Sequence, residues 1–441
     1  MRGLGILRTS HHIPMPWRAS GPRAGKSGAS RNLLLALVAL GAVLASSAPA
    51  PAGPLDGWSS PNVEFVKNVR VDLAGVSVSE TWGATLRGRY LYVTGWGVLT
   101  IFDVSRPEDP VKVSQLPAQL SLDSEVGAIA DAREDPDTNG TILPTLISLT
   151  PFVRKELVVV DVSNKAEPEI ISRLRLTERA HTISCLDDCR WAYISDGHII
   201  DLRDPRDPQL EPVLWNEQLR FFPTGFGPSP VHDVTEVAED LVLTASVPIY
   251  LLDTSNPLRP IVLAQSDSSP YSFGGVAWPN APHSSLVLSF SEPGAFPAPG
   301  CKVRDALQGT SYDSALATWD AAHWRRTGIF TRVDAYFPSD GVFADGNPPV
   351  SATHDSGCSA SWFDLHPNFR ERGLVAAAFY GNGVKFLQVS QEGKFEEQGY
   401  WLPSTSAVFG SIDAEWADED TVYAISIDRG IDVLRFTAPK S

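Results

Sequence analysis

The chain is poor in several residue types, and each shortage excludes a class of function. Only two of its 441 residues are Met, so a flexible Met-rich binding surface is excluded. Basic residues are in the minority, because 36 Lys and Arg stand against 52 Asp and Glu and give a formal net charge of −16. This balance makes nucleic acid and anionic membranes unfavourable partners. Pro and Gly, by contrast, are plentiful, with 35 and 34 residues, which suits many short strands joined by turns.

The N-terminal segment lacks acidic residues and carries a short apolar run. Six basic residues precede the run from Leu33 to Ala45, and small residues with Pro follow it in SSAPAPAG. The run is shorter than the roughly 20 residues that a membrane-spanning helix needs. This order predicts a secretory signal peptide over residues 1–48, followed by a flexible mature N-terminus over residues 49–62. An uncleaved anchor helix and a translation start at Met15 are the alternatives.

Cleavage of this signal peptide changes the charge of the protein. It leaves 30 Lys and Arg against 52 Asp and Glu, a formal charge of −22. We therefore expect an acidic protein that is secreted, periplasmic or at the cell surface, with no transmembrane segment in the mature chain.

Cysteine is scarce, and its four positions sort into two pairs. An oxidising compartment favours the disulfides Cys185–Cys189 and Cys301–Cys358. Metal ligation by the CLDDC segment is the alternative, although no second close pair of Cys or His completes a tetrahedral set.

An internal repeat organises the rest of the chain. Its clearest copies are YLYVTGWGVLTIFDVSRPEDP (90–110), ELVVVDVSNKAEP (156–168), WAYISDGHIIDLRDPRDP (191–208) and LVLTASVPIYLLDTSNPLRP (241–260). Two alternating apolar runs flank a short turn in each copy, which is typical of a β-hairpin. The second run usually ends in Asp before a turn that contains Ser or Pro. The aligned residues are Asp103, Asp161, Asp201, Asp253, Asp320, Gln388 and Asp432.

These seven units predict an all-β protein, a seven-bladed β-propeller of four-stranded blades over residues 63–441. Each hairpin is preceded by a further short strand, and each except the last is also followed by one. The sixth unit has its inner strand in THDSGCSA (353–360). The last unit has only three strands, so Val63 to Leu73 is expected to complete it. Insertions are expected near residues 131–141, 291–313 and 361–373, the last of them as a long turn.

The repeat residues resemble the LVIVD-repeat family of exported bacterial and archaeal β-propellers. The resemblance rests on YLYV…GVLTIFDVSRPEDP, LVVVDVSNKAEP and YLLDTSNPLRP. It implies an exported propeller and implies no particular reaction.

Polar residues recur where the inner strands begin, at one mouth of the predicted channel. Reading around the units gives Glu80, Glu125, His181, His232, Gly274, His354 and Asp413. His181, His232 and His354, with the acidic residues, form a candidate site for a divalent metal ion or a general acid–base set. The alternative is that these groups only form hydrogen bonds with strand ends and water.

The function predicted from the sequence is a non-catalytic binding module. We expect a monomer that binds a protein, a glycan or a cell-envelope component through the face that carries the insertions. The alternative is a metal-dependent enzyme with its site at the channel mouth, although the common G-x-S-x-G and H-E-x-x-H motifs do not occur.

Overall fold

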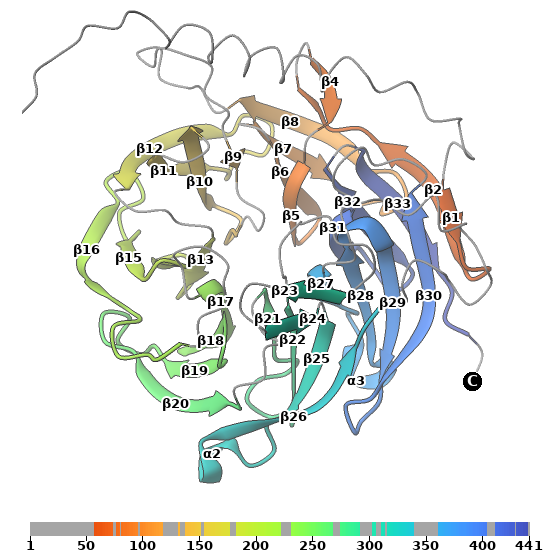
Figure 1. The fold of residues 1–441 in the computed structure, drawn as a ribbon. Helices are drawn as coiled ribbons and strands as arrows, with labels where there is room; N and C mark the ends of the chain where they lie inside the picture. Colours follow the sequence, from red (N-terminus) through yellow and green to blue (C-terminus); the bar gives the residue numbers. More distant parts are fainter. Residues whose placement is uncertain are drawn as a thin grey trace, which may run out of the picture. The chain divides into compact units, whose positions relative to one another are not determined.

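Figure 1 shows the computed structural model of the chain. The structure describes residues 57–73, 76–79, 81–95, 98–117, 131–132, 137–150, 154–176, 182–221, 231–267, 274–291, 302–305, 310–313, 315–338, 360–403, 411–427 and 429–439. The chain divides into two units, residues 1–52 and 53–441, and every described element belongs to the second.

Four-stranded antiparallel sheets follow one another along the chain (Figure 1). The first contains β5 (Thr81–Arg87), β6 (Tyr90–Gly95), β7 (Val98–Asp103) and β8 (Val111–Pro117). The second contains β9 (Asp131–Ala132), β10 (Ile142–Thr150), β11 (Arg154–Asp161) and β12 (Glu169–Leu176). The third contains β13 (Ile183–Leu186), β14 (Trp191–Ile194), β15 (His198–Asp201) and β16 (Gln209–Leu214).

The next two sets of four strands share one eight-stranded sheet. Its first half contains β17 (Val231–Ala238), β18 (Leu241–Ser246), β19 (Tyr250–Asp253) and β20 (Ile261–Ser266). Its second half contains β21 (Val276–Ala277), β22 (Leu286–Ser291), β25 (Ala315–Asp320) and β26 (Ile329–Tyr336). The halves meet through a short parallel pairing of β20 with β26, at Gln265 with Ile329 and Ser266 with Phe330.

The two remaining large sheets each take one strand from the N-terminal side. The first contains β27 (Ala360–Leu365), β28 (Leu374–Phe379), β29 (Gly383–Val389) and β30 (Phe395–Pro403), with β1 (Gly57–Ser59) beside β30. The second contains β31 (Ser411–Trp416), β32 (Thr421–Ser426) and β33 (Gly430–Phe436), and β2 (Val63–Val69) completes it. The register of β2 against β33 runs from Val63 opposite Phe436 to Val69 opposite Ile431. The predicted pairing of an N-terminal strand with the last unit is therefore confirmed for Val63–Val69, whereas residues 72–73, expected to continue that strand, pair with residues 76–79 instead.

Short elements lie between the large sheets. The two-stranded pairs are β3 (Asp72–Leu73) with β4 (Val76–Ser79) and β23 (Lys302–Asp305) with β24 (Thr310–Asp313). The helical turns are α2 (Trp324–Thr327), α3 (Phe369–Arg372) and η2 (Tyr380–Asn382). Within the described part of the chain, every helix is too short or too polar to cross a membrane.

The repeated Asp residues shape the turn after the third strand of their sheets. The side chain of Asp103 accepts a hydrogen bond from the Ser105 N–H at 2.8 Å, and that of Asp161 accepts one from Ser163 at 2.9 Å. The same contact recurs at Asp201, Asp253 and Asp320. A carboxylate that caps the backbone two residues ahead favours the turn, which explains why this residue type repeats.

The core lies between the sheets rather than within one of them. Each large hydrophobic cluster joins neighbouring sheets, as where Phe386 and Phe436 stack with ring centroids 4.4 Å apart. One such cluster joins Ala84 of the first sheet to Tyr423 of the last. Because successive sheets bury shared cores and the last packs on the first, the described sheets form an all-β propeller.

Three local features differ from the sequence predictions. Residues 57–59, expected to be flexible, form β1. The sixth hairpin takes its inner strand from β27, so residues 361–365 belong to a strand and not to a long turn. Asp432 lies inside β33 opposite Ala424, and Arg435 opposite Thr421 occupies the place of the repeated Asp.

Candidate functional site

His232, at the start of β17, is the described histidine of the predicted channel-mouth set. It is buried, and its Nδ1 lies 2.7 Å from the carbonyl oxygen of Gly274. The centroid of its ring lies 6.4 Å from that of the Phe290 ring and 6.0 Å from that of the Trp362 ring. A Cβ at Gly274 would come within 2.2 Å of Phe290, so only glycine leaves room for this packing. His232 thus links neighbouring inner strands through one ring nitrogen.

Asp413, in β31, is the described acidic residue of that set. Its Oδ2 accepts a hydrogen bond from the Ala84 N–H at 3.1 Å, and its Oδ1 accepts one from Ala414 at 2.8 Å. Burial raises the pKa of Asp413 to about 7, against the lowering effect of these hydrogen bonds. Asp413 therefore joins the inner strands of the last and first sheets and holds a proton more readily than an ordinary Asp.

Asp364, in β27, makes the equivalent link between the preceding sheet and the last one. Its Oδ2 accepts a hydrogen bond from the Trp416 N–H in β31 at 2.9 Å, and its Oδ1 accepts one from Leu365 at 2.7 Å. Burial raises the pKa of Asp364 to about 6. Asp364 is not among the residues predicted from the sequence, because it lies in a segment whose composition resembles a long turn.

The strand register changes which inner-strand residues are equivalent. Asp413 lies opposite Ile425 and Asp233 lies opposite Ala245, each after a register shift at its strand's start. Asp233, rather than His232, is therefore the counterpart of Asp413. Its buried side chain accepts a hydrogen bond from Ser184 Oγ at 3.1 Å, so it too links two sheets.

The other predicted site residues lie outside the described residues. They are Glu80, Glu125, His181 and His354, together with Cys301 and Cys358. Among the residues that the structure describes, no three or more His, Cys, Asp or Glu side chains are grouped so as to hold a metal ion.

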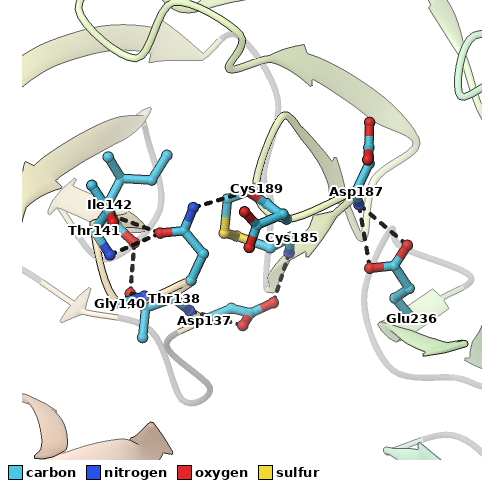
Figure 2. The surroundings of a disulfide bond; sticks show 11 residues. Asp137, Thr138, Gly140, Thr141, Ile142, Cys185, Asp187, Cys189 and Glu236 are labelled. Atoms are coloured by element: carbon cyan, nitrogen blue, oxygen red, sulfur yellow. Dashed lines mark hydrogen bonds between the residues drawn. A yellow bond between two sulfur atoms is a disulfide. The ribbon is translucent and has the colours of Figure 1, made fainter. Parts of the chain in front are cut away.

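The Cys185–Cys189 disulfide is present and confirms the first predicted bridge (Figure 2). It closes a turn in which Asp187, Asp188 and Cys189 adopt left-handed backbone angles, with φ of 51°, 56° and 59°. Asp137 Oδ2 accepts a hydrogen bond from the Cys185 N–H at 2.8 Å. The bridge and this contact hold an otherwise unfavourable backbone conformation in place.

An acidic cavity of about 300 Å³ lies beside this disulfide. It is lined by residues 137–139, 184, 185, 188, 189 and 233–236 and by Arg87. Glu236 accepts hydrogen bonds from the Asp187 N–H at 3.2 Å, as Figure 2 shows. Burial, and then the nearby carboxylates of Asp187, Asp137 and Asp240, raise the pKa of Glu236.

A larger groove of about 630 Å³ lies between the sheets that contain β22 and β29. It is lined by residues 279 and 283–286, by α3 with Gly373, and by residues 388–391. Gly373 has a φ of 61°, and a Cβ there would lie 2.3 Å from the Val389 carbonyl oxygen. The α3 turn therefore packs closely against β29 and forms one wall of the groove.

Both hollows are lined by turns at the same end of their sheets. In an antiparallel four-stranded sheet, the turn between the first and second strands and the turn between the third and fourth lie at one end. We call the surface formed by these turns the turn face. Residues 137–139 and 187–189 contribute to it at the acidic cavity, and residues 279–286, 369–373 and 390–391 contribute at the groove.

Comparisons with solved structures return proteins of low sequence identity. The RRP9 WD40 repeats are 8% identical over 86% of this chain and 99% of that chain, with a TM-score of 0.49. The periplasmic gluconolactonase PpgL of Pseudomonas aeruginosa is 13% identical over 76% of this chain and 89% of that chain, with a TM-score of 0.45. A protein of unknown function from Desulfotomaculum acetoxidans is 13% identical over 75% and 87%, with a TM-score of 0.47.

No curated protein is similar in sequence to this chain. The LVIVD repeat matches it at residues 80–116 and 152–175. The first match covers the strands of the first sheet almost completely, and the second covers β11 and nearly all of β12. The resemblance seen in the sequence is thereby confirmed, and the chain carries LVIVD repeats.

Proposed function

We propose that the chain is an exported, seven-bladed β-propeller that binds a protein, a glycan or a cell-envelope component without catalysing a reaction. A signal peptide over residues 1–48 precedes a single propeller over residues 63–441. The propeller acts as a monomer, and its ligand binds on the turn face.

The position of two of the three insertions supports this proposal most directly. The third, near 291–313, connects β22 to β25 and so lies at the other end of its sheet, which differs from the expectation of a single face that carries all the insertions. Parts of the segments near 131–141 and 361–373 lie in first-to-second-strand turns, and each lines a hollow on the turn face. Insertions that build hollows on one face of a rigid scaffold are typical of binding surfaces.

The polar groups of the inner strands give a second line of support. Asp233, Asp364 and Asp413 each accept a hydrogen bond from a group of a neighbouring inner strand. The Nδ1 atom of His232 likewise forms a hydrogen bond with the carbonyl oxygen of Gly274. These contacts fit side chains that hold the sheets together.

Binding and metal measurements on matched variants test the proposal. The mature protein is titrated with isolated envelope polysaccharides and envelope proteins, alongside a turn-face variant (Asp188→Asn with Arg370→Gln) and a channel-mouth variant (His181→Ala, His232→Ala and His354→Ala). We expect saturable binding that the turn-face variant weakens and the channel-mouth variant leaves unchanged, with both folded by circular dichroism.

The opposite pattern would favour the metal-dependent enzyme. Stoichiometric metal in the native protein that disappears from the channel-mouth variant, together with turnover of a ligand, contradicts a non-catalytic role. Binding that the turn-face variant leaves intact contradicts the assigned surface.

A further inference from the structure

The groove between the sheets of β22 and β29 differs in charge from the rest of this acidic protein. Its lining contains the cations of Arg370 and Arg372 and one carboxylate, Glu371, so its formal charge is positive although the chain's is −16. Arg372 is engaged, because its Nη1 lies 3.1 Å from His366 Nε2 and donates to the Glu419 carbonyl at 3.3 Å. Arg370 is exposed on the groove wall.

A second, independent observation concerns Gln388, which also lines the groove. Gln388 pairs with Leu374, as Asp103 pairs with Tyr90 and Asp253 with Leu241, so it occupies the place of the repeated Asp. Its side-chain amide donates a hydrogen bond to the Arg372 carbonyl. At this groove, the carboxylate that the repeat carries in the first five sets of four strands is replaced by a neutral donor.

From these two features we infer that the groove binds an anionic saccharide, with a carboxylate of the sugar against Arg370. A volume of about 630 Å³ is within the range of small-ligand sites. An Asp at position 388 would repel such a ligand, and Gln removes that repulsion. The inference rests on the proposed binding function and names its ligand class.

The construction of the groove favours a saccharide over an acidic peptide. Extended peptides commonly bind by adding a strand to an exposed sheet edge. The groove is lined by the turn before β22, by α3 and by the turn after β29. A ligand in it would therefore meet side-chain groups rather than the backbone groups of a strand edge. Amide, hydroxyl and guanidinium groups of Gln391, Ser285 and Arg370 instead match a ligand rich in hydroxyl groups and carrying a carboxylate.

Calorimetric titration with trigalacturonate, an acidic trisaccharide, tests the inference, with the neutral trisaccharide of galactose as the matched probe. We expect wild-type binding that weakens with salt, and at least tenfold weaker binding of the neutral probe, because the neutral probe lacks the carboxylate that makes the charge-assisted contact with Arg370. Equal affinity for the two probes would overturn the inference.

Four variants locate the site. Arg370→Gln is expected to weaken trigalacturonate binding about tenfold, since it removes the charge-assisted contact. Arg326→Gln, an exposed Arg in α2 outside the groove lining, is the control and should bind like wild type. Gln388→Glu should weaken binding by restoring a negative charge, whereas Gln388→Met removes the amide without adding charge and should retain most of the affinity.

The outcomes separate failure of the inference from failure of the proposed function. Unchanged affinity in Arg370→Gln, with wild-type melting, places the saccharide elsewhere. Tighter binding of hexaglutamate than of trigalacturonate assigns the groove to acidic peptides instead. If neither probe binds but Asp188→Asn weakens binding of an envelope component, the inference fails while the binding function stands.

Discussion

At the scale of single residues, the buried carboxylate of Asp413 affects how stability depends on pH. Its pKa is raised in the folded protein, so the folded state holds a proton that the unfolded state has already released. The contribution of the protonated Asp413 side chain to the free energy of unfolding is full below about pH 4 and declines as the pH rises towards 7. Between about pH 4.5 and 6.5, Asp413 should therefore lower the free energy of unfolding of the wild type by about 1 kcal/mol per pH unit. We expect Asp413→Asn to remove this pH dependence, as measured by urea unfolding at several pH values.

The matched control is Asp161→Asn, a repeat Asp with the opposite shift. Hydrogen bonds from Ser163 lower the pKa of Asp161, so its contribution is lost only as the pH falls below the ordinary range of Asp. Its variant should therefore keep the wild-type slope over the same pH range. Parallel slopes for wild type and Asp413→Asn would contradict the assignment.

Asp432 carries a second residue-scale prediction. It is fully buried, and it pairs with Arg429 through Nη2–Oδ1 at 2.9 Å and Nε–Oδ2 at 3.0 Å. Asp432→Asn leaves the guanidinium without its counter-charge, so we expect a loss of about 3 kcal/mol in the free energy of unfolding. Asp320→Asn, at an exposed turn, should cost far less in the same urea titration, and equal losses would contradict this account.

At the scale of elements, strand β2 closes the last sheet. Val63 is buried, and Phe65 stacks on Trp401 with ring centroids 5.0 Å apart. A chain that starts at residue 70 should therefore melt roughly 5 °C or more below one that starts at residue 60, since both lack β1 and only the second retains β2. Equal melting temperatures by calorimetry would show that β2 adds nothing to stability.

The disulfide turn is a second element with a measurable contribution. Cys185 and Cys189 are separated by four positions, so the bridge closes a very short loop. In the loop-entropy account, such a bridge stabilises the folded state by about 2 kcal/mol. Replacing both Cys by Ser should lower the free energy of unfolding by that amount under oxidising conditions. Under reducing conditions, the wild type should approach the variant.

The elements also show what the sequence could and could not predict. The hairpins with Asp103, Asp161, Asp201 and Asp253 were predictable, because alternation and turn chemistry are local. The inner strand β27 was misplaced, since polar residues at 353–360 resemble the other inner strands and residues 361–373 resemble a long turn. Asp233 was passed over for His232 because a register shift at the strand start cannot be seen in one strand alone.

At the scale of the whole molecule, a second disulfide would connect neighbouring sheets. We expect Cys301, after β22, to be bonded to Cys358, before β27, in protein exported to an oxidising compartment. Peptide mapping without reductant should yield a fragment that joins these residues and separates on reduction. Free thiols at both positions would contradict the prediction.

The position of β2 beside β33 has a mechanical consequence. Val63, where β2 begins, lies opposite Phe436, where β33 ends. A force that pulls the two ends of the chain apart therefore first peels β1 from β30 and then opens the β2–β33 ladder from one end. Its hydrogen bonds are loaded in succession rather than together, so the propeller should yield to tension at this seam before any other sheet carries the load.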